Sequence, residues 1–219
     1  MENLTEIVFI LDRSGSMSGL ERDTIGGFNS FVEKQKKEEG RALVTTVLFD
    51  TELSTIHDRV PLEKMEKLTE KEYYTGGCTA LLDAIGTTVH HIGEIHRYAR
   101  EEDRPQKTIF VITTDGEENS SREYTYPKIK KLIGKKKEEG WEFIFLGANI
   151  DAISTAGRMG IAEECAANYV CDSVGTAVNF MALSGLVGKV RRSKGKAMID
   201  VDRSWKKDIE DYYDEKKGK

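Results

Sequence analysis

The chain has 219 residues, of which 38% are hydrophobic and 32% charged, and its formal net charge is −5 at pH 7. This hydrophobic content fills the core of one domain, so the composition argues against a disordered chain. The acidic balance argues against a nucleic-acid-binding surface, and no apolar run approaches the roughly 20 residues that span a bilayer.

The N-terminal residues and the cysteines indicate the cellular compartment. The first 17 residues are acidic where a signal peptide is basic, and their apolar stretch leads directly into Asp12 and Arg13. The cysteines are odd in number and form no C-x-x-C pair, which predicts free thiols in a reducing compartment (Cys78, Cys165 and Cys171). We therefore expect a cytoplasmic protein.

The chain begins with a strand and a helix. Residues 4–11 (LTEIVFIL) are apolar and rich in β-branched and aromatic side chains, which predicts a buried strand. A polar turn follows, and apolar side chains on one face then predict a helix over about residues 18–39. Gly26 and Gly27 inside that helix each cost about 1 kcal/mol relative to alanine. Close packing of the helix on a sheet would account for them.

The next segment predicts a hairpin and a long helix. Residues 42–49 (ALVTTVLF) form a second strand, and a tight turn leads into a third strand at 52–57. Two strands joined so closely are antiparallel, because a parallel crossover needs a dozen or more residues. Apolar side chains at helical spacing then predict a helix of about five turns over residues 81–96.

The second half of the chain alternates strands with helices. We expect strands at 107–114, 141–146 and 167–171, and helices at 129–140, at 150–159 and from the last strand to about residue 191. This alternation predicts an α/β fold with a doubly wound, mostly parallel central sheet, one antiparallel edge strand and helices on both faces. In such folds ligands bind outside the carboxyl ends of the strands, where the strand order switches.

The domain is expected to occupy residues 1–192, followed by a charged extension over 193–219. Four apolar or aromatic side chains of the extension have helical spacing: Trp205, Ile209, Tyr212 and Tyr213. Both a short docked helix and a solvated tail fit this spacing.

Three short segments carry the candidate chemistry. Residues 12–16 (DRSGS) follow the first strand, residues 76–79 (GGCT) open the helix at 81, and residues 114–116 (TDG) follow the strand at 107–114. The first and fourth strands are neighbours at the switch point of a doubly wound sheet. We therefore expect the three segments to meet in one crevice.

Together these segments offer three hydroxyls and two carboxylates, from Asp12, Ser14, Ser16, Thr79 and Asp115. Oxygen donors without histidine or cysteine suit Mg²⁺, Mn²⁺ or Ca²⁺ rather than zinc. Ser14 and Ser16, two positions apart on a tight turn, can face one ion. If one carboxylate reaches the ion only through water, the ion stays electrophilic and can accept an outside oxygen.

The order of these motifs resembles the von Willebrand factor A domain and its metal-ion-dependent adhesion site. The likeness covers roughly residues 4–190, and the stretches DRSGSM, TALLDAI and TDGEENSS are similar to those of small stand-alone bacterial A-domain proteins. The resemblance implies a Rossmann-like fold in which Ser14 and Ser16 bind the ion directly. It also implies that Thr79 binds directly in the ligand-competent state, and that Asp12 and Asp115 lie close, often through water.

One feature departs from that pattern. Glu117 and Glu118 directly follow Asp115 and are expected to add negative charge at the mouth of the site. That charge would discourage the acidic partner that adhesive members of the family use as sixth ligand, and Arg13 is positioned in the sequence to offset it.

Three functions fit the motifs. The leading hypothesis is a non-enzymatic protein-binding module that captures a partner's Asp or Glu carboxylate through the cation, and a structural scaffold subunit of a larger complex fits equally. The rival is a Mg²⁺-dependent phosphoryl-transfer enzyme. Such enzymes need a nucleophilic Asp, a nearby second acid and a lysine after a later strand. Here Ser14 stands two positions after Asp12, and residues 146–149 (LGAN) contain no lysine.

Neither the cysteine next to Thr79 nor the histidines of the long helix are predicted to form a functional site. Cys78 has no histidine at an informative spacing, which favours a free thiol packed in a loop. His91 and His96 lie five positions apart and lack the i, i+4 spacing of a zinc-binding pair.

Overall fold

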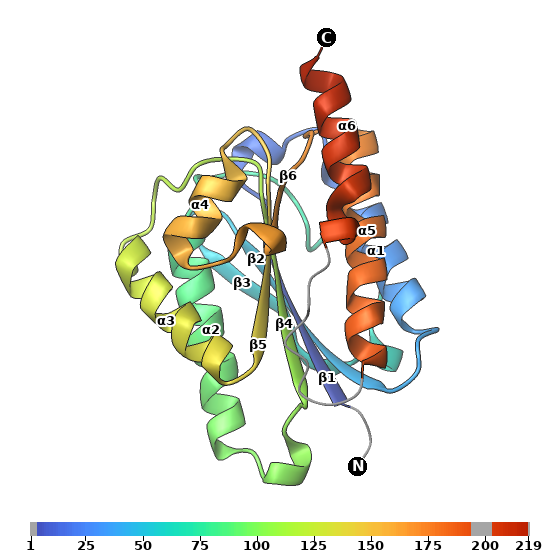
Figure 1. The fold of residues 1–219 in the computed structure, drawn as a ribbon, viewed down its shortest axis with the longest axis vertical. Coiled ribbons are helices and arrows are strands. Elements are labelled where there is room, and N and C mark those ends of the chain that lie inside the picture. Colours follow the sequence, from blue (N-terminus) through green and yellow to red (C-terminus); the bar gives the residue numbers. More distant parts are fainter. Residues whose placement is uncertain (1–3, 194–202, 219) are drawn as a thin grey trace.

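The computed structural model describes residues 4–193 and 203–218, which form a central sheet covered by helices on both faces (Figure 1). The strands of the sheet are β1 (Leu4–Asp12), β2 (Arg41–Phe49), β3 (Leu53–Pro61), β4 (Lys107–Thr114), β5 (Trp141–Gly147) and β6 (Ala166–Asn168). The α-helices are α1 (Glu21–Gln35), α2 (Leu81–Tyr98), α3 (Tyr126–Glu138), α4 (Ala152–Met159), α5 (Ser173–Arg192) and α6 (Lys207–Lys217).

The predicted fold class is confirmed. The six strands lie in the order β3-β2-β1-β4-β5-β6. Every neighbouring pair is parallel except β2 and β3, so the antiparallel strand lies at an edge. β1 and β4 are neighbours, and the connections run outward from them in opposite directions. The switch point of the sheet is therefore at the carboxyl ends of β1 and β4.

The central strand β1 is buried on both faces because helices cover both. Ile7, Phe9 and Leu11 point toward α1 and α5, and Val8 and Ile10 point toward α2. The two sets belong to two separate hydrophobic clusters, one on each side of the sheet. Covering both faces explains why β1 reads as a continuous apolar run rather than an alternating one.

Several boundaries differ from the predicted ones. β3 continues to Pro61, past the predicted end at residue 57, through a bulge where Arg59 adopts a positive φ of 51° and donates its N–H to Thr45 Oγ1. α1 begins at Glu21 rather than near residue 18, because Gly15–Met17 form a 3-10 turn and Gly19 follows with a φ of 93°. α3 begins at Tyr126, three residues before the predicted start.

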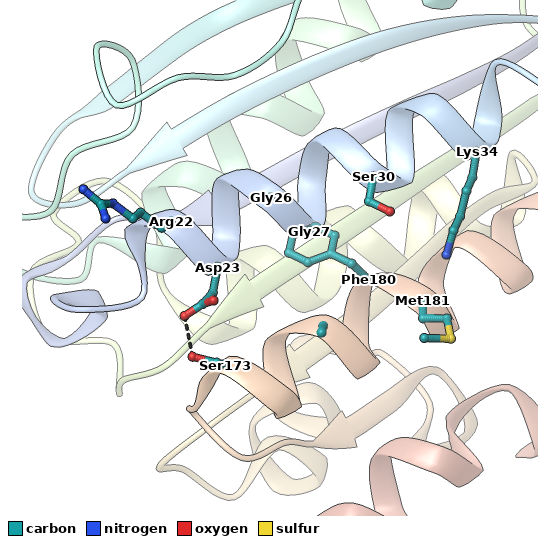
Figure 2. Close-up of a pocket in the computed structure, with 10 residues that line it drawn as sticks. Arg22, Asp23, Gly26, Gly27, Ser30, Lys34, Ser173, Phe180 and Met181 are labelled. Carbon is teal, nitrogen blue, oxygen red and sulfur yellow. Dashed lines mark hydrogen bonds between the residues drawn. The ribbon is translucent and has the colours of Figure 1, made fainter.

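The packing expected at the two glycines of α1 is only partly correct. A Cβ on Gly27 would lie 2.2 Å from the ring of Phe180, so the close neighbour is helix α5 rather than the sheet (Figure 2). A Cβ on Gly26 would meet nothing within 4 Å. Close packing therefore accounts for Gly27 and leaves Gly26 unexplained.

Helix α5 lies against α1 and α6 on one face of the sheet (Figure 1). In the described part of the chain it is the one helix long and apolar enough to cross a membrane by length and composition, yet 56% of its apolar 18-residue window is buried inside the fold. Such burial is typical of a core helix.

The C-terminal segment docks on the domain as a helix. Trp205 and Ile209 are buried in the cluster that contains the core of α5. Trp205 Nε1 donates to the carbonyl of Glu164 at 2.9 Å, and Lys206 Nζ donates to the carbonyl of Ala166 at 2.8 Å. Over residues 203–218 the docked helix is thus the arrangement observed, and it covers the edge strand β6. Residues 194–202 of the predicted extension lie outside the described residues, and the domain boundary at 192 stays a prediction.

Candidate metal centre

The three predicted segments meet at the carboxyl edge of the sheet. Asp12 ends β1, Asp115 follows β4, and Thr79 lies just before α2. Two backbone hydrogen bonds join the first segment to the second: Gly15 N–H donates to the Gly77 carbonyl at 3.2 Å, and Gly76 N–H donates to the Arg13 carbonyl at 2.9 Å. The sheet order and these two bonds bring together segments that are far apart in the sequence.

Asp12 is the most constrained side chain of the set, with 1% of its surface exposed. Its Oδ1 accepts the Ser14 N–H at 2.7 Å, and its Oδ2 accepts the Thr114 hydroxyl at 2.6 Å. The hydroxyl of Tyr73 donates to the Asp12 carbonyl at 2.6 Å. Asp12 therefore fixes the turn that carries the serines and links it to β4.

The serine hydroxyls face one another and one carboxylate. Ser14 Oγ lies 3.1 Å from Ser16 Oγ, and Ser16 Oγ donates to Asp115 Oδ1 at 2.5 Å. Ser14 is buried, whereas Ser16 is exposed at the opening of the site. A serine that uses a lone pair to bind a cation keeps its proton, so cation binding and the Ser16–Asp115 bond are compatible.

Thr79 is held beside the Asp115 loop by a reciprocal pair of hydrogen bonds. Its N–H donates to Asn119 Oδ1 at 2.9 Å, and the Asn119 N–H donates to the Thr79 carbonyl at 3.1 Å. A Cβ on Gly116 would lie 3.6 Å from both Thr79 Oγ1 and Ser16 Oγ. The absence of a side chain at Gly116 keeps open the space beside these two hydroxyls.

The electrostatics of the site favour a positive ligand. Burial raises the pKa of Asp12, and the nearby charge of Asp115 raises it further. Burial also raises the pKa of Asp115, against the lowering effect of the Ser16 hydrogen bond. Two partly desolvated carboxylates in one small volume repel each other, and a bound cation would relieve both penalties.

Arg13 was expected from the sequence to offset the negative charge of Glu117 and Glu118. Arg13 Nε lies 2.8 Å from Asp50 Oδ2, and its guanidinium stacks over Tyr74 with 4.8 Å to the ring centroid. The expectation that Arg13 offsets the glutamates after Asp115 is therefore wrong, because its partner is Asp50.

Glu118 was expected to add negative charge at the mouth of the site, but the structure turns its carboxylate toward backbone amides. Its Oε1 accepts the N–H groups of Ser120 and Ser121 at 2.9 and 2.7 Å, and its Oε2 accepts the Leu82 N–H at 2.9 Å in the first turn of α2. A carboxylate there satisfies amides at a helix start. Glu118 therefore stabilises α2 and the 118–121 loop, and of the two glutamates only Glu117 is exposed.

The donor set fits a hard divalent cation. Within residues 4–193 and 203–218, no group of three or more His, Cys, Asp or Glu side chains could hold a metal. The candidate centre instead combines two carboxylates with three neutral hydroxyls, and oxygen ligands of this kind suit Mg²⁺, Mn²⁺ or Ca²⁺.

Four residues around the site were not predicted from the sequence to support it: Tyr73, Asn119, Asn149 and Cys171. Thr114 belonged to the predicted segment 114–116, but its hydrogen bond to Asp12 was not predicted. Asn149 Nδ2 donates to the Asp115 carbonyl at 3.4 Å, and Cys171 Sγ donates to Asp115 Oδ2 at 3.6 Å. Asn149 follows β5 and Cys171 follows β6, at the same edge of the sheet as Asp115. For Asn149 and Cys171, the position shortly after a predicted strand was the sequence feature that could have indicated a place near the site. Cys78, expected to be packed in a loop, is exposed.

The sheet order, the single antiparallel edge and the helices on both faces define the fold of a von Willebrand factor A domain. No protein-family model matches the sequence, and no curated protein matches it. The likeness is to solved structures, at identities low enough that it shows the fold alone.

Three of these structures illustrate the sequence identities, TM-scores and coverages of the matches. Proximal thread matrix protein 1 from the mussel byssus is 16% identical with a TM-score of 0.60, over 85% of this chain and 46% of that chain. The von Willebrand factor domain of the type V pili tip protein Mfa5 from Porphyromonas gingivalis is 10% identical with a TM-score of 0.61, over 88% and 98%. Manganese-loaded TRAP from Plasmodium vivax is 14% identical with a TM-score of 0.57, over 82% and 74%.

The present chain spans less than half of the mussel protein. That protein has also been solved with a zinc-occupied metal-ion-dependent adhesion site. Two of the structural neighbours thus carry a divalent metal, manganese in one and zinc in the other.

Proposed function

We propose that the chain is a protein-binding module that uses a divalent cation, with Mg²⁺ as the resident ion, to capture a partner's Asp or Glu carboxylate. The ion would be held by Asp12, Ser14, Ser16, Thr79 and Asp115. The observation that carries the proposal is the convergence of two partly desolvated carboxylates and three hydroxyls from three loops at the switch point of the sheet.

The balance of charged and neutral donors supports capture of an acidic partner. Three of the five proposed donors are neutral hydroxyls, so the positive charge of the ion is offset only by Asp12 and Asp115. Asp115 already accepts hydrogen bonds on both carboxylate oxygens, from Ser16 and Cys171. If Asp115 reaches the ion through water, the ion keeps net positive charge and attracts a carboxylate from outside.

The exposure of the residues at the site also supports binding of a partner from solvent. Ser16, Gly15 and Gly77 are exposed, whereas Asp12, Ser14 and Thr79 are buried. The pilus tip protein among the structural neighbours supports a role in binding other proteins. Free cysteines support a cytoplasmic location, which we propose together with the function.

The geometry disfavours the phosphoryl-transfer alternative. Both oxygens of Asp12 accept hydrogen bonds and only 1% of the residue is exposed, so it is poorly placed as a nucleophile. The position after β5, where such an enzyme needs a lysine, is Asn149, whose amide donates to the Asp115 carbonyl. We therefore propose a binding function rather than an enzymatic one.

A short peptide tests the carboxylate capture directly. Mn²⁺ replaces Mg²⁺ as a paramagnetic probe, and water-proton relaxation reports the water molecules bound to it. A blocked tripeptide Gly-Glu-Gly is expected to lower the relaxation enhancement by displacing water, and the matched Gly-Gln-Gly peptide is expected to leave it unchanged. Equal responses to the two peptides would rule out selective capture of a carboxylate.

A further inference from the structure

Cys171 lies in the connection between β6 and α5 and contacts Asp115 of the candidate metal centre. The two oxygens of Asp115 are divided between two donors: Oδ1 accepts the Ser16 hydroxyl at 2.5 Å, and Oδ2 accepts the Cys171 thiol at 3.6 Å. With one donor on each oxygen, the carboxylate is held in one orientation. We propose that Cys171 is a positioning residue of the metal centre and that helix α6 keeps it in place, an inference that rests on the proposed function.

The two residues after Cys171 tie the same short segment to two helices. Asp172 Oδ2 accepts the Tyr212 hydroxyl of α6 at 2.8 Å and lies 3.6 Å from Lys216 Nζ. Ser173 Oγ donates to Asp23 Oδ2 in the first turn of α1 at 2.7 Å (Figure 2). Three consecutive side chains therefore contact the Asp115 loop, α6 and α1.

Asp172 also starts helix α5. Its Oδ1 accepts the Gly175 N–H at 2.7 Å, the N-cap bond of that helix. A Cβ on Gly175 would lie 2.0 Å from the Val170 carbonyl oxygen, so the backbone before and after Cys171 is folded tightly on itself. Because this turn is tightly packed, we expect a shift of Asp172 to move Cys171 as well.

Helix α6 is a firm support for this segment. Its base is fixed by the buried side chains of Trp205 and Ile209 and by the hydrogen bonds of Lys206 to backbone carbonyls. Tyr212 lies further along the same helix, which packs against α5 and β6 (Figure 1). The Lys216–Asp172 pair is partly exposed and contributes little by itself, so Tyr212 is the main contact between α6 and the segment.

Groups that orient a metal-binding carboxylate affect metal affinity although they do not touch the metal. Loss of such a group typically costs roughly 10–100-fold in affinity. Because a thiol is a weak donor, we expect Cys171→Ala to weaken Mn²⁺ binding by about fivefold to tenfold. Cys171→Ser restores a donor and is expected to recover most of the loss. Tyr212→Phe, which removes one neutral hydrogen bond at a distance, is expected to weaken binding by about twofold to threefold.

The test compares Mn²⁺ affinities of the full chain and these three variants by electron paramagnetic resonance. Tyr213→Phe is the matched control, because it removes a hydroxyl from the adjacent position of α6. A thermal melt of each metal-free variant separates a change in affinity from a change in folding. As a second readout, iodoacetamide labelling of Cys171 is followed by mass spectrometry after Cys78→Ser removes the exposed thiol. Labelling is expected to be faster with Tyr212→Phe and unchanged with Tyr213→Phe.

The outcomes separate this inference from the proposed function. If the wild-type chain binds no Mn²⁺, the proposed metal site is wrong. If the wild type binds Mn²⁺ and Cys171→Ala binds it equally well or more tightly, only the role of Cys171 is overturned. If Cys171→Ala weakens binding while Tyr212→Phe matches Tyr213→Phe in both readouts, the link to α6 is overturned.

Discussion

The hydroxyl of Ser16 donates to Oδ1 of Asp115 at 2.5 Å, although the two residues are 99 positions apart in the sequence. Ser16 lies in the turn after β1 and Asp115 in the turn after β4, and these strands are parallel neighbours at the centre of the sheet. The contact follows from the strand order, and it places a hydroxyl and a carboxylate at one opening where both are available to a cation.

Thr79 is expected to matter more for carboxylate capture than for holding the metal. In Thr79→Ala four of the five proposed oxygen donors remain, so Mn²⁺ affinity should fall only a few-fold. The response of bound Mn²⁺ to the Gly-Glu-Gly peptide should fall further, because the variant favours direct coordination by Asp115 and leaves less net charge on the ion. The exposed Thr87 of α2 supplies the control, Thr87→Ala. Equal losses of metal and peptide binding would contradict the distinction.

The paired glycines of α1 give opposite expectations for stability. Gly26→Ala meets no neighbour within 4 Å and removes the helix penalty of glycine, so unfolding free energy should rise by about 0.5–1 kcal/mol. Gly27→Ala places a methyl group 2.2 Å from the Phe180 ring and should lower stability by about 1–3 kcal/mol. Urea denaturation of both variants measures the difference. Shifts of the same sign would show that the α1–α5 contact is misplaced.

Docking of α6 depends on Trp205, a buried aromatic side chain in the 3-10 turn just before the helix. Trp205 is 7% exposed and its indole N–H donates to the Glu164 carbonyl. Trp205→Ala should therefore lower the free energy of unfolding by about 3–5 kcal/mol. Tyr98→Ala, at a side chain that is 77% exposed, should change it by less than about 0.5 kcal/mol. If urea denaturation gave Trp205→Ala the same stability as Tyr98→Ala, α6 would not be docked in solution.

The pH dependence of stability has an identifiable contribution from His57 on β3. Burial lowers the pKa of this imidazole, whose ring stacks on Phe28 with centroids 6.4 Å apart. The unfolded chain takes up a proton near pH 6.5 that the folded chain resists, so stability contributed by His57 is full above about pH 6.5 and declines as the pH falls below it. His57→Gln should flatten this decline in urea denaturation series at several pH values. His90→Gln, at an exposed position, should leave it as in the wild type.

Much of the fold could be predicted because its signals are local. The apolar runs of β1 and β4 and the helical periodicity of α2 mark elements whose type does not depend on distant contacts. The extension of β3 to Pro61 was missed because it requires a bulge at Arg59, and the sequence carries no local sign of that bulge. The start of α1 was placed too early because the turn at Gly15–Met17 and the positive φ of Gly19 interrupt the chain.

The convergence of the five candidate metal ligands could be predicted from the sequence because each lies at the end of a strand, shortly after one, or just before a helix. Their supports were missed because they depend on tertiary direction. The charge of Glu118 is evident from the sequence, but the direction of its side chain, toward the Leu82 N–H in the first turn of α2, is not. Similarly, Asn119 and Cys171 contact the site only because the loops fold back on it.

Calorimetric titration of Mg²⁺ and Mn²⁺ into chelator-stripped protein tests the central claim most directly. Asp12→Ala removes the carboxylate that fixes both Ser14 and Thr114, and Asp58→Ala, at an exposed carboxylate on β3, is the control. We expect the wild type and Asp58→Ala to bind one ion with micromolar-to-millimolar affinity, and Asp12→Ala to give no binding heat while remaining folded. Equal binding by wild type and Asp12→Ala would contradict the assignment of the metal centre.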